Sequence, residues 1–252
     1  VIAIFAGLIV AAAVALSRKA LLWFVITGGL VIFGVAQLYL PAAKYIRYII
    51  PLASVLLVLH GVMDQLRRNG VKDAGVKLPG LLLWALAFVA IALTSSIVNR
   101  SNPGVAIMGL KGYFQMWPLL LGLILIRWDQ ETIALVLKGM LAIAFLQLPF
   151  VLHQYFLLVP LRQGLGGGII PVDIVSGTFG ASLYGGGANA VLAAYMVIMM
   201  VCLLGLWKHG AISTPKAAMV CVLLLAPLFI NEAKISALYI LLVYVVLFYK
   251  EI

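Results

Sequence analysis

Few side chains in this sequence are suited to acid–base or charge-binding chemistry, and two of them lie in one glycine-rich segment. The segment 160–187 holds nine glycines in 28 residues, and its only charges are Arg162 and Asp173. Asp173 is either solvated at a loop tip, paired with a base, or placed in a cleft as a proton acceptor. Arg162 either reaches toward water from the end of an apolar helix, or grips an anionic headgroup or a pyrophosphate through its planar fork.

Three further candidates border apolar stretches. Glu232 and Lys234 interrupt the apolar stretch 215–249. They are either the exposed tip of a hairpin or groups facing a helix-bundle interior, where ionisable side chains are expensive and tend to be functional. His153, just before the glycine-rich segment, is either an interfacial residue or an acid–base group. Seven acidic residues and three histidines are too dispersed to give a metal-ligand spacing, so we expect neither a metal site nor a bound cofactor.

The composition predicts which kind of structure must position these side chains. The chain has 252 residues, of which 65% are hydrophobic and 10% charged, with a mean hydropathy of +1.22. A soluble domain is nearer ~45–50% apolar and ~25% charged, because its surface faces water. We therefore expect an all-α, polytopic membrane protein. The net charge of +10 is explained by loop charges and anionic lipids and does not indicate nucleic-acid binding.

Charges, prolines and glycine clusters divide the chain into about nine predicted transmembrane helices in one transmembrane domain, residues 1–252. Their ranges are 1–17, 21–40, 46–63, 79–98, 106–126, 132–158, 188–207, 215–230 and 235–249. The last two form a hairpin at the polar interruption, because a single helix over 215–249 would rise ~52 Å, beyond the ~30 Å hydrocarbon core.

The basic residues predict an orientation. If the first span runs from outside to inside, ten basic loop residues lie on the cytoplasmic side and six on the other. Arg18 and Lys19 follow the first apolar run, an order that favours a true span over a signal peptide. Because the sequence begins at Val1, we expect it to be part of a longer chain.

In this orientation the segment 160–187 is a long periplasmic loop. It carries aliphatic and aromatic residues as well as glycine, whereas a flexible linker would be polar. We therefore expect it to fold back onto the protein or the interface, with glycines permitting tight turns. Loops of this length are usually functional or disordered, and this one is too apolar for disorder.

Two stretches resemble a known family. Gly177–Gly180 reads Gly-Thr-Phe-Gly and is followed by Asn189-Ala190 at the start of a span. The later polar break, 231–236, reads Asn-Glu-Ala-Lys-Ile-Ser. Together they resemble the O-antigen ligase and polymerase superfamily of bacterial envelope proteins over roughly residues 79–250. The break carries Lys234 where many members carry arginine, which keeps the charge but weakens a bidentate grip on phosphate.

The resemblance implies metal-independent glycosyl transfer on the periplasmic face of the bacterial inner membrane. The donor would be a glycan on undecaprenyl pyrophosphate, and membrane lipids and other polysaccharide assembly proteins would be partners. The leaving pyrophosphate needs cations, for which Arg162, Lys234 and Arg100 are candidates. The attacking sugar hydroxyl needs a base, for which Asp173, Glu232 and His153 are candidates.

Two other functions stay open at this point. A transporter or flippase of a lipid-linked substrate would have discontinuous helices at the membrane midplane and inverted repeats, and no convincing repeat relates the two halves. A non-catalytic scaffold of an envelope complex would have all its charges exposed or reaching toward water.

Overall fold

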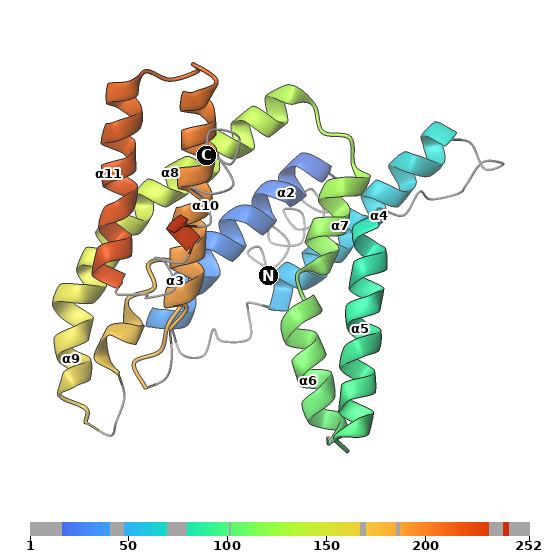
Figure 1. Ribbon diagram of the computed structural model, residues 1–252, viewed down its shortest axis with the longest axis horizontal. Coiled ribbons are helices and arrows are strands. Elements are labelled where there is room, and N and C mark those ends of the chain that lie inside the picture. Colours follow the sequence, from blue (N-terminus) through green and yellow to red (C-terminus); the bar gives the residue numbers. More distant parts are fainter. Residues whose placement is uncertain are drawn as a thin grey trace, which may run out of the picture. The chain divides into compact units, whose positions relative to one another are not determined.

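The computed structural model describes residues 17–40, 48–69, 80–100, 102–166, 170–184, 187–231 and 239–241. Their regular elements are all helices, which confirms the predicted all-α class. Figure 1 shows the labelled helices along the chain. The longer ones are α2 (Arg18–Thr27), α3 (Phe33–Tyr39), α4 (Ile49–Asn69), α5 (Gly80–Val98), α6 (Pro103–Phe114), α7 (Trp117–Leu125), α8 (Gln130–His153), α10 (Asn189–Lys208) and α11 (Thr214–Asn231).

Shorter helical turns join or extend some of these helices. The π-helical turn η1 (Gly28–Ile32) connects α2 to α3. Another π-helical turn, η3 (Gln154–Leu158), leads from α8 into α9 (Val159–Gln163). A 3₁₀ turn, η4 (Pro171–Ile174), lies in the glycine-rich loop.

Five helices in the described part are long and apolar enough to cross a membrane. They are Arg18–Tyr39, Ile49–Arg68, Gln130–Gln163, Asn189–Lys208 and Thr214–Asn231. These helices correspond to the spans predicted at 21–40, 46–63, 132–158, 188–207 and 215–230. The helix Gly80–Val98 corresponds to the span predicted at 79–98. Within it, Leu86–Val98 is an apolar stretch that is shorter than the five helices above.

Other predicted features stay predictions. The spans at 1–17 and 235–249 and the hairpin at 231–236 fall wholly or largely outside the described residues. The full number of nine spans and the single domain over 1–252 therefore stay predictions as well.

The predicted span 106–126 differs from the structure. There α6 ends at Phe114 and α7 begins at Trp117. Pro118 lies in the first turn of α7. Proline has no backbone N–H, and it is tolerated in a first turn because an N–H at that place has no partner within the helix. A helix that starts at Trp117 accommodates Pro118 better than a helix running through it.

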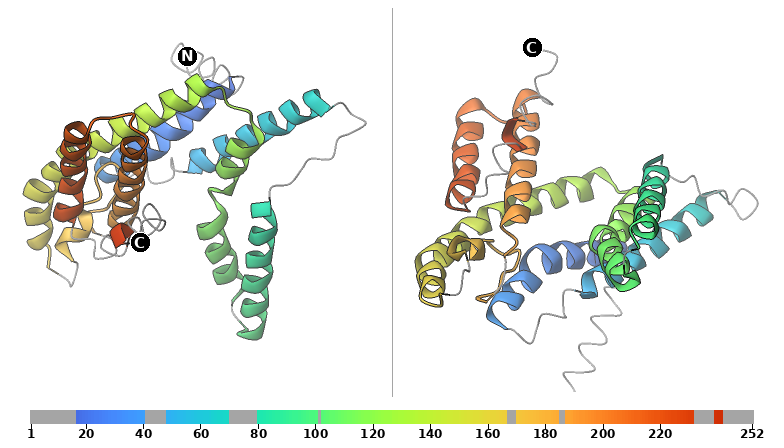
Figure 2. Two further views of the ribbon diagram at one scale, coloured as in Figure 1. Left: turned by 45° about the horizontal axis from the view of Figure 1, so that its top comes forward. Right: turned by 60° about the horizontal axis from the view of Figure 1, so that its bottom comes forward.

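The chain divides into two compact units. Unit 1 comprises Val1–Val25 and Tyr48–Asp129, and unit 2 comprises Ile26–Arg47 and Gln130–Ile252. In unit 1, α4 packs on α7, and α5 lies beside α6 (Figures 1 and 2). Gly61 and Gly122 bring α4 and α7 close: a Cβ atom at Gly122 would lie 2.7 Å from the Cβ atom of Leu57. Small residues at a crossing are typical of packed membrane helices.

Unit 1 also contains a cluster of ion pairs, here called the charged cluster. Asp64 pairs with Arg18 at 3.6 Å and with Arg68 at 3.0 Å, and Asp129 pairs with Lys19 at 2.9 Å. The start of α2, the end of α4 and the α7–α8 connection therefore meet at one place. The predicted topology puts all three on the same side of the membrane.

In unit 2, α10 packs against α8 and α11 and has eight buried residues. Figure 1 shows α10 and α11 side by side. The helix Gln130–Gln163 has 34 residues and a rise of ~51 Å, so it must tilt or project beyond a ~30 Å hydrocarbon core. Its last turns, η3 and α9, pack against η4 of the glycine-rich loop. This corner of unit 2 holds three of the predicted site residues.

Candidate functional site

Two buried glutamines hold the glycine-rich loop in place. Gln154 accepts hydrogen bonds through Oε1 from the backbone N–H groups of Ser176 (2.9 Å) and Gly177 (2.8 Å), and its Nε2 donates to the Gly177 carbonyl at 2.7 Å. Gln147 accepts from the Thr178 N–H at 2.8 Å and donates to the Thr178 hydroxyl at 2.8 Å. Both side chains are 0% exposed. We call Gln147, Gln154 and the bonded residues Ser176–Thr178 the amide clamp.

The Gly-Thr-Phe-Gly motif packs against α3, the helix that follows η1. Gly177 and Gly180 have φ angles of +59° and +96°, which favour glycine. A Cβ atom at Gly34 would lie 1.9 Å from the Thr178 carbonyl oxygen, so only glycine leaves room for the loop there. The Thr178 hydroxyl donates to the carbonyl of Leu30 in η1. The motif therefore has a structural role: it packs the loop onto two helices.

Sequence reasoning missed the amide clamp. Gln147 and Gln154 stand seven residues apart in an apolar span, a spacing that puts both on one face of a helix. Two amides on the same face of an apolar helix were the available signal. The sequence-based prediction gave a role to His153 and none to Gln154 beside it.

Asp173 lies in η4 and is only partly exposed. Its Oδ1 accepts a hydrogen bond from Nδ2 of Asn189 at 3.3 Å. The loop returns close behind it, since a Cβ atom at Gly187 would lie 1.8 Å from the Asp173 carbonyl oxygen. Asp173 is thus held by an amide at the start of α10, with part of its surface open to a ligand.

Asn231, the last residue of α11, extends this arrangement. It is 1% exposed, and its Nδ2 donates to the backbone carbonyl of Asn189 at 2.7 Å. Its Oδ1 is buried and accepts no hydrogen bond within the described part of the chain. Hydrogen bonds therefore connect Asp173 through Asn189 to Asn231, the first residue of the polar break 231–236. We call these three residues the Asp–Asn–Asn chain.

Arg162 is buried rather than directed toward water. It is 2% exposed and is among the largest fully buried side chains of the structure. It lies in α9, which packs against the turn η4 that bears Asp173. A guanidinium costs free energy to bury, so its burial here argues against the interpretation as a surface anchor.

His153, the last residue of α8, contacts the end of α3. Its Nδ1 lies 2.9 Å from the hydroxyl of Tyr39, and the two rings are 5.9 Å apart. The residue after it is Gln154 of the amide clamp. His153, Arg162 and Asp173 therefore all belong to unit 2, on elements that lead into the loop or form it.

Arg100, Glu232 and Lys234 are the remaining predicted site residues. Arg100 belongs to unit 1, where it follows α5 with a φ angle of +48° and lines a cavity of about 340 Å³. Glu232 and Lys234 lie outside the described residues. The roles predicted for these three residues stay predictions.

Among the residues that the structure describes, no group of three or more histidine, cysteine, aspartate or glutamate side chains gathers at one place. Comparison with family models, curated proteins and solved structures finds no match to this chain. The geometry of unit 2 and the two sequence motifs are therefore the basis for a functional proposal.

Proposed function

We propose that this protein is a membrane glycosyltransferase of the O-antigen ligase and polymerase kind. It transfers a glycan from undecaprenyl pyrophosphate at the periplasmic face of a bacterial inner membrane, without a metal ion. The observation that carries the proposal is the Asp–Asn–Asn chain. Its bonds of 3.3 Å and 2.7 Å connect the loop containing Gly177–Gly180 to Asn231, the first residue of the polar break 231–236. These two stretches are far apart in sequence, and they are the ones on which the resemblance rests.

The proposed reaction is a single displacement at the anomeric carbon of the donor sugar. Asp173 takes the proton of the acceptor hydroxyl, whose oxygen forms the new bond to the anomeric carbon. The bond from that carbon to the pyrophosphate oxygen breaks with its electron pair, and undecaprenyl pyrophosphate leaves. His153 and Glu232 are the other candidate bases.

The leaving pyrophosphate gains negative charge that must be stabilised. Arg162 is buried behind η4, so it acts in this proposal as a fixed positive charge in a region of low dielectric constant. Lys234 is the candidate for direct contact with phosphate oxygens, and the role predicted for Arg100 in unit 1 stays a prediction. In this proposal the partly exposed carboxylate of Asp173 accepts the proton, and the buried guanidinium of Arg162 stabilises the charge of the leaving group.

The test is to replace Asp173 and Arg162, one at a time, by neutral side chains in cells that make the glycan. Asp173→Asn removes the base and keeps the shape, and Asp129→Asn is the matched control in the charged cluster. Removal of a general base lowers a rate by about 10²–10⁴-fold, so we expect Asp173→Asn to abolish glycan extension or transfer. Arg162→Gln is compared with Arg127→Gln, an exposed arginine in the α7–α8 connection.

Glycan chain length on the lipid carrier and the amount of glycan transferred are the readouts, at equal protein level in the membrane. Normal glycan products from Asp173→Asn would remove Asp173 from the proposed reaction. Normal products from both Asp173→Asn and Arg162→Gln would overturn the catalytic proposal as a whole.

One observation favours transport as the second candidate. The segment 106–126 is broken between α6 and α7, and discontinuous helices are typical of transporters. The same variants distinguish the two functions. An enzyme defect leaves the lipid-linked glycan in the outer leaflet, where added periplasmic glycosidase digests it. A transport defect leaves it in the inner leaflet, protected from digestion.

A further inference from the structure

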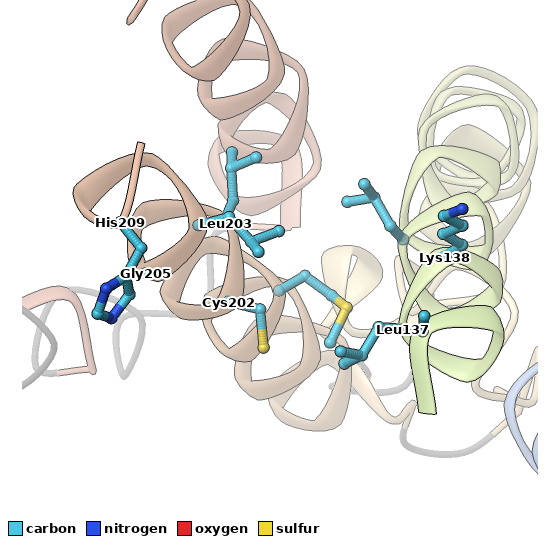
Figure 3. A pocket seen from close by; sticks show the side chains of 10 residues that line it. Leu137, Lys138, Cys202, Leu203, Gly205 and His209 are labelled. Atoms are coloured by element: carbon cyan, nitrogen blue, oxygen red, sulfur yellow. The ribbon is translucent and has the colours of Figure 1, made fainter. Parts of the chain in front are cut away.

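An apolar cavity lies between α8 and α10, away from the loop. Its volume is about 430 Å³, within the ~300–1,000 Å³ of typical ligand sites. Leu137 and Leu141 line it from α8, and Met199 and Leu203 line it from α10. Figure 3 shows Leu137 on one side of the cavity and Leu203 on the other. Both helices belong to segments apolar enough to cross a membrane, so the cavity suits a hydrocarbon chain.

The polar groups at the edge of this cavity are basic. Lys138 stands on α8 and His209 directly follows α10, and both are exposed and belong to the lining (Figure 3). No carboxylate is among the lining residues. Lys138 forms no ion pair with another described residue. An anionic headgroup thus complements the edge, as an alkyl chain complements the interior.

The position of the cavity agrees with this chemistry. The beginning of α8 and the end of α10 both contribute to it, and the predicted topology places these two ends on the cytoplasmic side. Basic pockets between transmembrane helices on that side bind anionic lipid headgroups.

We propose that the cavity between α8 and α10 binds an anionic glycerophospholipid of the inner leaflet. One acyl chain lies between the leucines and methionine of the two helices. The phosphate lies at Lys138. The site is distinct from the Asp–Asn–Asn chain and does not depend on glycosyl transfer.

Gly205 provides a way to fill the cavity without disturbing the fold. It lines the cavity, and a Cβ atom there would meet no other atom within 4 Å. Gly205→Leu therefore occupies the space of the acyl chain, and leucine favours a helix more than glycine does. Gly109→Leu is the matched control, because Gly109 also lies in a helix with open space at its Cβ position.

The experiment measures lipid binding to the delipidated full chain by native mass spectrometry. Phosphatidylglycerol and phosphatidylcholine with the same acyl chains are the probes. Wild type and Gly109→Leu are expected to bind phosphatidylglycerol about fivefold or more tightly than phosphatidylcholine, because one lysine attracts a headgroup of net negative charge and the choline cation cancels that charge in phosphatidylcholine. Lys138→Gln is expected to lose this preference, and Lys216→Gln, an exposed lysine of α11, to keep it. Gly205→Leu is expected to lose the bound lipid of both kinds.

Three results would overturn the proposal. The first is equal binding of the two lipids by wild type. The second is phosphatidylglycerol binding by Gly205→Leu at the wild-type level. The third is a change of oligomeric state in Gly205→Leu but not in Gly109→Leu, which would make the cavity an interface with a second copy.

Discussion

The charged cluster of unit 1 and the amide clamp of unit 2 are two solutions to positioning polar groups in a very apolar chain. In the charged cluster, side chains such as Lys19 and Asp129 are about half exposed, at 52% and 48%. In the amide clamp, Gln147 and Gln154 are 0% exposed and carry no charge. One region keeps its ions at the water surface, and the other buries neutral groups with their hydrogen bonds made.

The two regions contribute differently to the free energy of unfolding. A partly exposed ion pair contributes little, because water and salt screen it. A buried amide contributes little net free energy when its bonds are made, but each unmade bond costs about 1–3 kcal/mol. The charged cluster therefore adds little to stability, whereas the amide clamp determines the shape of the loop that carries Asp173.

The largest expected effect comes from Gln154→Leu. The change leaves the N–H groups of Ser176 and Gly177 and the carbonyl of Gly177 without a partner in a buried place. Three such groups cost about 3–9 kcal/mol together. The free energy of unfolding in mixed micelles measures it, with the exposed Gln163→Leu as the control. A loss equal to that of the control would mean that the clamp does not stabilise the loop.

A smaller loss is expected from Gly34→Ala, which tests the contact between the loop and α3. The new Cβ atom would overlap the Thr178 carbonyl oxygen, so helix or loop must shift. Overpacking of this kind costs about 1–3 kcal/mol. Gly109→Ala, in open space within α6, is expected to change stability in the opposite direction, by up to about 1 kcal/mol. Thermal unfolding of both variants checks the sign. Equal shifts would contradict the close packing at Gly34.

Much of the fold could be predicted from the sequence, because the lengths of the apolar stretches determine where the long helices form. The helices containing Leu21, Leu57 and Leu192 were predicted from the apolar stretches between charges, prolines and glycine clusters. The break before Pro118 was missed, since prolines are tolerated within membrane helices.

The candidate site was less predictable than the helices. Asp173 and Arg162 were found because charge is rare here. The partners that fix the loop were not found, since glutamine and asparagine contact backbone groups 23 to 42 residues away. Such pairings have no local periodicity. The burial of Arg162 likewise depends on how η4 folds back, which no pattern within α9 indicates.

In the charged cluster, Asp64→Asn is expected to lower stability by about 1 kcal/mol or less. Asp64 pairs with both Arg18 and Arg68, but all three side chains are 27–41% exposed. Arg68 also keeps its bonds to the backbone carbonyls of Asp64 and Leu125. Chemical unfolding of Asp64→Asn beside Asp129→Asn, which loses one pair, measures the effect. A loss as large as that of Gln154→Leu would reverse the contrast between the two regions.

The smallest expected effect separates the two regions by salt. Raising NaCl from about 0.1 M to about 1 M shortens the Debye length from about 10 Å to about 3 Å. The stability difference between wild type and Asp64→Asn should therefore shrink toward zero, because its ion pairs face water. The difference between wild type and Gln154→Leu should stay constant, because buried neutral amides interact at contact distance, where mobile ions do not enter. Measuring both differences at both salt concentrations cancels the general effect of salt on hydrophobic packing, which all three proteins share. A salt-dependent loss in Gln154→Leu would mean that charge also holds the loop, and the buried Arg162 in α9 would be the side chain to exchange next.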